Sequence, residues 1–149
     1  MRRLLLIGCV ASKALASMPA RDLYQSQLFR ARRDYAEAQG CPWAIVSAYE
    51  MAIIEPQQMM HPYDRRIDCL SDAELERWTV MLQVNAYAVF GEQLRGATVE
   101  VHAGKHYVEA VTRGLHGYGV GYGVTITAPL RGLAIGKQLQ WYAERRATV

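Results

Sequence analysis

The sequence is poor in cysteine and has no long apolar run, and both absences narrow the class of protein. The three cysteines, Cys9, Cys41 and Cys69, form no CxxC pair and no Cys/His cluster with zinc-finger spacing, so neither a disulfide framework nor a zinc site is expected. Free thiols are usual in a reducing compartment, which makes the cytoplasm the expected location. Every apolar stretch falls far short of the about 20 residues that cross a bilayer, so no membrane contact is expected.

Short motifs that bind nucleotides or metals are also absent. The chain has no GxxxxGK[ST] phosphate loop and no HExxH metal motif, and the GYG repeats at 117–123 do not have GxGxxG spacing. His102 and His106 are four residues apart, as on one face of a helix, but no third metal ligand stands near them. We therefore expect no metal and no cofactor.

The composition is typical of one globular domain. The chain has 149 residues, of which 51% are hydrophobic and 21% are charged, and this length suits a single α/β domain over residues 1–149. The net charge is only +3, but arginines gather in two places. They are Arg21, Arg30, Arg32, Arg33, Arg65 and Arg66 in the first half and Arg145 and Arg146 near the end. Solvated helix faces explain most such arginines, although this balance permits a phosphate-bearing ligand.

Short apolar runs alternate with segments of helical spacing. The runs predict strands at 4–7, 43–46, 98–101 and 124–127. Helices are predicted over 23–39, from the capping box at Ser71–Glu74 to Phe90, over 105–115 and over 132–145, with an irregular segment at 51–70 and a glycine-rich turn at 117–123. Because parallel strands are joined by helical crossovers, this order predicts an α/β fold. We expect a single-domain three-layer sandwich, in which helices flank a mostly parallel sheet of about four strands.

Four loops that follow predicted strands should share one edge of this sheet. They span 8–13, 47–50, 102–106 and 128–132, and ligands of open α/β sheets bind beyond the carboxyl ends of the strands. In the first loop, Ser12 and Lys13 offer a hydroxyl, a cation and backbone N–H groups to an anion. Arg131 in the fourth loop is a further cation for a phosphate or sugar.

Three ionisable side chains are candidates for catalysis. Glu50 follows a strand closely, and it is either a nucleophile or general base or an exposed loop glutamate. His102 ends a strand and is a candidate proton shuttle at neutral pH. Asp64 follows Pro62-Tyr63 in the long loop, which either folds over the site or forms an ordinary turn.

Several spaced motifs cover nearly the whole chain. They are Gly8-Cys9 with Ser12-Lys13, Asp22-Leu23-Tyr24-Gln25-Ser26 with Leu28-Phe29, Ser47-Ala48, Pro62-Tyr63-Asp64, His102-Ala103-Gly104 with Tyr107, and Pro129-Leu130 with Gly132-Leu133-Ala134-Ile135-Gly136 and Gln138-Leu139-Gln140-Trp141. In these motifs the chain resembles an uncharacterised bacterial α/β domain family. That family is distantly similar to a domain of archaeosine synthase, which modifies a deazaguanine base in transfer RNA. The resemblance implies chemistry on a base, a nucleoside or a nucleic acid. Where relatives usually have a glycine, this chain has Met51, so either the turn differs here or Glu50 has a role of its own.

These observations favour an enzyme that acts on a nucleobase-containing compound, which is a nucleoside, a nucleotide or a modified base. The leading reaction is cleavage of the N-glycosidic bond or transfer of the base. Glu50 or Asp64 would stabilise or attack an oxocarbenium-like centre, and His102 would protonate the leaving base. The substrate-binding residues would be Tyr24, Tyr49 and Tyr63, which stack on the base, and Ser12, Lys13 and Arg131, which hold a phosphate or sugar. Two alternatives stay open: a non-catalytic module that binds nucleotides or nucleic acid, and an interaction subunit of a larger assembly.

Overall fold

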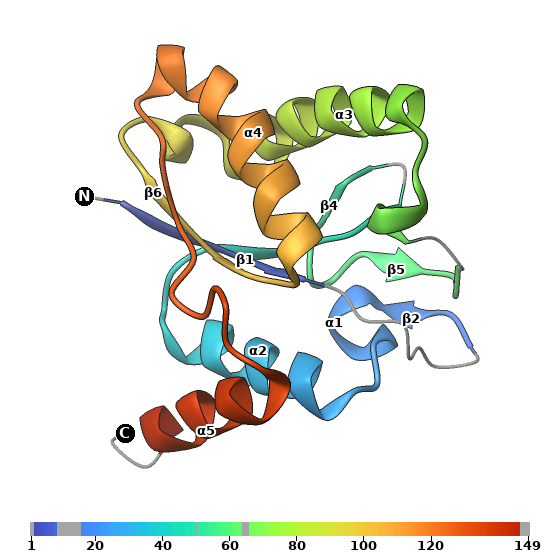
Figure 1. The fold of residues 1–149 in the computed structure, drawn as a ribbon, viewed down its shortest axis with the longest axis vertical. Coiled ribbons are helices and arrows are strands. Elements are labelled where there is room, and N and C mark those ends of the chain that lie inside the picture. Colours follow the sequence, from blue (N-terminus) through green and yellow to red (C-terminus); the bar gives the residue numbers. More distant parts are fainter. Residues whose placement is uncertain (1, 9–15, 50, 64–65, 147–149) are drawn as a thin grey trace.

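The computed structural model describes residues 2–8, 16–49, 51–63 and 66–146, and it describes residues 117–121 by their backbone alone. Its main sheet has five strands in the order β4-β3-β1-β6-β7 (Figure 1). These strands are β1 (Arg3–Gly8), β3 (Trp43–Val46), β4 (Ile53–Ile54), β6 (Thr98–His102) and β7 (Thr125–Thr127). β1 pairs in parallel with β3 and β6, β6 pairs in parallel with β7, and β4 runs antiparallel to β3. The predicted α/β fold with a mostly parallel sheet is therefore confirmed.

The helices connect these strands. They are α1 (Ala20–Leu23), α2 (Gln27–Ala38), α3 (Asp72–Phe90), α4 (Lys105–Tyr122) and α5 (Ile135–Arg146), with short 3-10 helices at η1 (Ile67–Cys69) and η2 (Gly91–Leu94). β2 (Met18–Pro19) and β5 (Met59–Met60) form a separate antiparallel pair. The start of α3 is the predicted capping box, because the Ser71 hydroxyl accepts from the Glu74 N–H and the Glu74 carboxylate accepts from the Ser71 N–H.

Helices cover both faces of the sheet. Leu4 and Leu6 of β1 point into a core shared with α3 and α4, whereas the alternate residues Leu5 and Ile7 point into a core shared with α1 and α2. Figure 1 shows α3 and α4 on one side of the strands, and α2 with α5 on the other. The continuous apolar run of β1 is explained by this burial on both faces. The part of the chain that the structure describes contains no helix long and apolar enough to cross a membrane.

Two predicted helix boundaries were wrong. The predicted helix over 23–39 is broken into α1 and α2, because Ser26 caps a new helix by accepting from the Phe29 N–H at 3.0 Å. The last helix begins at Ile135 rather than Gly132, which has a φ of +84° and belongs to the preceding turn.

The glycine-rich turn predicted at 117–123 was also wrong, because α4 continues to Tyr122. Glycine costs about 1 kcal/mol in a helix, but contacts with α3 and β7 hold α4 in place and outweigh this cost. Gly123, with a φ of +67°, is where the helix ends. The segment at 51–70 contains β4, the fifth strand of the sheet, which the sequence prediction missed.

Candidate functional site

The order of the strands locates a candidate binding position at one edge of the sheet. After β1 the chain crosses to β3 through α1 and α2 on one face, and after β6 it crosses to β7 through α4 on the other face. Because neighbouring strands β1 and β6 send their connections in opposite directions, their carboxyl ends form the switch point at which open α/β sheets bind ligands. Gly8 ends β1 and His102 ends β6, so these residues lie at the switch point.

Two backbones approach closely at the switch point. A Cβ placed on Gly8 would lie 2.6 Å from the Cβ of Ala103, so the neighbouring strand leaves no room for a side chain there. Arg32 of α2 is 3% exposed, and its Nη1 donates to the Gly8 carbonyl at 3.2 Å while its Nη2 donates to the Gln138 Oε1 at 3.4 Å. A buried guanidinium is therefore held at the carboxyl end of β1, where its charge favours an anionic group.

Three hydroxyl groups meet at the carboxyl end of the adjacent strand, β3. The Tyr63 hydroxyl lies 2.5 Å from the Tyr24 hydroxyl and is also hydrogen-bonded to the Ser47 hydroxyl. Ser47 and Tyr24 are buried, whereas Tyr63 and its neighbour Tyr49 are half-buried, with their ring centroids 5.2 Å apart. The hydroxyl cluster of Tyr24, Ser47 and Tyr63 thus fixes Tyr63, while the rings of Tyr49 and Tyr63 stay partly accessible.

Hydrogen bonds from two helices fix the backbone that carries this cluster. The Trp78 indole of α3 donates to the Ser47 carbonyl at 2.7 Å, and the Tyr107 hydroxyl of α4 accepts from the Ala48 N–H at 2.9 Å. Both aromatic side chains are buried. The polar atoms of the turn after β3 are therefore tied to the opposite helical layer, which keeps the hydroxyl cluster in register with the sheet.

The same turn contains Met51, which has no left-handed backbone. The left-handed backbone falls one residue later, at Ala52, which has a φ of +64°. The Asn85 side chain of α3 donates to the Met51 carbonyl, and the Ala52 carbonyl accepts from the Ser47 N–H at 2.9 Å. These bonds hold a conformation that costs a non-glycine residue free energy.

His102 is buried at the switch point with both ring nitrogens hydrogen-bonded. Its Nδ1 lies 2.7 Å from the Tyr142 hydroxyl of α5, and its Nε2 lies 2.5 Å from the Glu100 Oε2. The His102 side chain is 1% exposed. A proton can therefore pass between His102 and a ligand only if one of these hydrogen bonds opens or if the Tyr142 hydroxyl relays it.

Glu100 is the charged centre of this buried network. Its carboxylate accepts from the Arg3 Nη2 at 3.0 Å and from the Tyr35 hydroxyl at 3.2 Å, in addition to the contact with His102. Burial alone would raise the pKa of Glu100, but hydrogen bonds from His102 and Arg3 and the charges of both outweigh burial and lower that pKa to about 2. Burial also raises the pKa of the Tyr142 phenol above its usual range. At neutral pH the network therefore holds a carboxylate and a protonated phenol.

The structure brings some of the predicted site residues together and separates others. Tyr49 and Tyr63 are neighbours, whereas Tyr24 is buried against Phe29, with ring centroids 4.9 Å apart, so its ring supports Tyr63 and has no face open to a ligand. Arg131 is exposed after β7, and strands β1 and β6 separate it from the hydroxyl cluster. The other predicted site residues, Ser12, Lys13, Glu50 and Asp64, lie outside the described residues.

Several residues of the site were not predicted from the sequence. They are Arg32, Ser47, Glu100 and Tyr142, which supply the guanidinium, one hydroxyl of the cluster and both partners of His102. One signal was available for Glu100: it is two residues before His102 in a strand, so the two side chains share a face.

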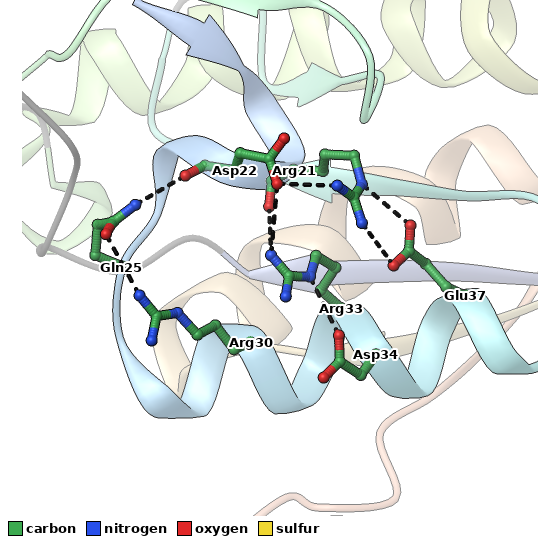
Figure 2. A network of polar contacts seen from close by, with 7 residues as sticks. All are labelled: Arg21, Asp22, Gln25, Arg30, Arg33, Asp34 and Glu37. Carbon is green, nitrogen blue, oxygen red and sulfur yellow. Dashed lines mark hydrogen bonds and ion pairs between the residues drawn. The ribbon is translucent and has the colours of Figure 1, made fainter. Parts of the chain in front are cut away.

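Two arginines of the arginine-rich first half, Arg21 and Arg33, form ion pairs with carboxylates of the chain itself. Figure 2 shows the Arg21 guanidinium bonded to the Glu37 carboxylate, with nitrogen–oxygen distances of 2.9 and 3.1 Å, and to Asp22 at 2.9 Å. Arg33 lies 3.2 Å from Asp34 and 3.7 Å from Asp22. Their charges are therefore partly neutralised by carboxylates of the chain itself, as expected for solvated helix faces.

Residues 4–144 match the model of DUF6884, which is described as a family of unknown function. The chain belongs to the DUF6884 family. The match includes the switch point, the hydroxyl cluster and, apart from Arg3, the network around Glu100. No curated protein and no solved structure matches the chain significantly. Among the residues that the structure describes, no group of three or more His, Cys, Asp or Glu side chains could hold a metal ion.

Proposed function

We propose that the chain is an enzyme that acts on a nucleobase-containing compound bound beyond the carboxyl ends of β1, β3 and β6. The observation that carries this proposal is the pair of partly accessible rings, Tyr49 and Tyr63, of which Tyr63 is held beside the switch point by the hydroxyl cluster and Tyr49 packs against it. Aromatic rings that are fixed by their own hydrogen bonds can stack on a flat base without a large loss of side-chain entropy. Cleavage of the N-glycosidic bond, or transfer of the base, is the proposed reaction.

The proposed catalytic groups follow these rings in the sequence. Glu50 and Asp64 are the next residues after Tyr49 and Tyr63. In the proposal one of these carboxylates stabilises or attacks the developing oxocarbenium-like centre, while Ser12 and Lys13 hold a phosphate or sugar. The buried Arg32 guanidinium at the Gly8 carbonyl adds positive charge to the same edge.

His102 is the proposed proton source for the leaving base. Its hydrogen bond to the Glu100 carboxylate fixes the orientation of the ring at the end of β6. Because Tyr142 occupies Nδ1, the proton reaches the substrate through the Tyr142 hydroxyl or after that bond opens. In either case His102 would act from a buried position and would not contact the substrate while these hydrogen bonds are in place.

The alternative of a non-catalytic nucleic-acid module has less support. Such a module would bind the nucleic-acid backbone through exposed arginines. Two of the arginines, Arg21 and Arg33, instead form ion pairs with carboxylates of α1 and α2 (Figure 2). A module that binds nucleic acid through its backbone should show affinity that falls steeply with salt. An enzyme for small nucleobase compounds should bind a nucleoside, which carries no phosphate, with an affinity that depends little on salt.

The test combines a ligand screen with matched variants. Nucleobases, nucleosides and nucleotides are first screened for a rise in melting temperature, and released free base is then measured by chromatography. Glu50→Gln should abolish release while ligand binding and melting temperature stay nearly unchanged, and the control Glu55→Gln, at an exposed position of the same segment, should keep full activity. Full activity of Glu50→Gln would remove Glu50 from the reaction. Absence of any stabilising nucleobase compound would overturn the proposal.

A further inference from the structure

A groove separates the outer faces of α2 and α5, two helices that lie side by side in Figure 1. Its volume is about 480 Å³, which is within the range of small-molecule sites. The lining residues are Gln27, Arg30, Ala31, Asp34, Leu139, Gln140, Ala143 and Arg146. None of them belongs to the hydroxyl cluster or to the network around Glu100, so the groove is separate from the proposed catalytic site.

The lining combines an apolar part with polar ends. Ala31, Leu139 and Ala143 are small or aliphatic, and Ala31 and Leu139 belong to the cluster that packs α5 on α2. A flat apolar group fits such a surface because it removes apolar area from water on both sides. The amides of Gln27 and Gln140 can both donate and accept hydrogen bonds, as the edge of a heterocycle requires.

The charges of the groove favour an anion. It is lined by two guanidinium groups, Arg30 and Arg146, and by one carboxylate, Asp34. Figure 2 shows that the Asp34 carboxylate is bonded to Arg33, which lies outside the lining, whereas Arg30 donates to the neutral Gln25 side chain at 3.4 Å. Asp34 is thus partly neutralised from outside, and a net positive charge remains inside the groove.

We propose that this groove binds an organic phosphate that carries a flat heterocycle, of the nucleoside monophosphate class. The phosphate lies between Arg30 and Arg146, whose planar guanidinium groups bind phosphate through paired N–H donors. The heterocycle lies against Ala31, Leu139 and Ala143. The site is additional to the proposed catalytic site, and it does not depend on the reaction proposed there.

The test is calorimetric titration of the whole chain with AMP, adenosine and inorganic phosphate at low salt. AMP should bind more tightly than either of the other two, because it alone presents both halves of the ligand. Arg30→Gln combined with Arg146→Gln should weaken AMP binding by about tenfold or more. Ala143→Trp leaves every charge in place but fills the groove at an exposed position, and it should abolish the AMP binding event that the double arginine variant weakens.

Two control variants separate this site from the rest of the molecule. Arg113→Gln removes one exposed arginine from α4, on the other face of the sheet, and should leave AMP affinity unchanged. Tyr63→Phe disrupts the hydroxyl cluster and so reports on AMP bound at the proposed catalytic site, whereas the AMP binding event that is lost in Ala143→Trp should persist in it. If AMP fails to bind, or binds equally well to Ala143→Trp, the proposal is overturned. If AMP binding is lost in Tyr63→Phe but kept in both groove variants, the ligand occupies the proposed catalytic site and the groove is not a nucleotide site.

Discussion

Replacement of Glu100 by glutamine tests whether the buried network is held together by a carboxylate charge. Glutamine keeps the size of the side chain but cannot be ionised. The pKa of Glu100 is lowered from 4.5 to about 2 in the folded chain, and this difference corresponds to about 3 kcal/mol of folding free energy. Glu100→Gln should therefore lower the free energy of unfolding by about 3 kcal/mol at pH 7, which a domain with 5–15 kcal/mol of stability survives.

The effect should depend on pH in a defined direction. Because the folded pKa of Glu100 lies below the unfolded one, its stabilisation is complete above about pH 5 and is lost as the pH falls from 4.5 through 2. The difference between wild type and Glu100→Gln, measured by urea unfolding, should shrink to less than half its neutral value at pH 3.

A matched surface pair supplies the control for this experiment. Glu92 pairs with Arg95 at 3.1 Å, and both side chains are more than 60% exposed. Glu92→Gln should change stability by less than about 1 kcal/mol at either pH. An equal loss for Glu100→Gln at pH 7 and pH 3, or a loss no larger than that of Glu92→Gln, would refute the assignment of Glu100 as the charged centre.

Three further predictions concern other parts of the structure. Gly8→Ala should destabilise the fold by about 1–3 kcal/mol because its Cβ would lie 2.6 Å from the Ala103 Cβ and 2.9 Å from the Ala103 Cα. Adding Ala103→Gly removes the first of these contacts and should restore part of the loss in thermal unfolding; no recovery would contradict the close approach. Ser71→Ala should lower the free energy of unfolding by about 1 kcal/mol because the capping box is lost, whereas Ser71→Asp should keep most of it. Equal losses for the two variants in urea unfolding would contradict the cap. Cys69 is exposed, and burial raises the pKa of the Cys41 thiol, so mass spectrometry after brief alkylation should find Cys69 modified before Cys41. Faster modification of Cys41 would contradict this order.

The fold was largely predictable because its strands are buried on both faces. The run Leu4–Ile7 has no polar residue, as a central parallel strand requires, and the capping box at Ser71 marks the start of α3 in the sequence itself. The glycines at 117–121 were misleading because local propensity favours a turn, whereas contacts of α4 with α3 and β7 are made by segments distant in sequence.

The candidate site was less predictable because its partners come from distant segments. Parallel pairing places the ends of β1, β3 and β6 on one edge, and this much followed from the order of the elements. That Tyr142 would bond to His102, or Arg32 to the Gly8 carbonyl, depends on how α5 and α2 pack on the sheet. The packing register of helices on a sheet is a tertiary property with no signature in the local sequence.

The central place of β1 in the sheet has a consequence for how the chain folds during synthesis. β1 is made before the other strands of the sheet, and its neighbour β6 is made about 95 residues later, since Arg3 pairs with Thr98. At typical elongation rates this interval is roughly 5–20 s. Throughout it, the strand that becomes the middle of the sheet has at least one open edge, and the apolar run Leu4–Ile7 is available for wrong pairing. Refolding of the finished chain should therefore be less prone to aggregation than the nascent chain, because both neighbours of β1 are present from the start.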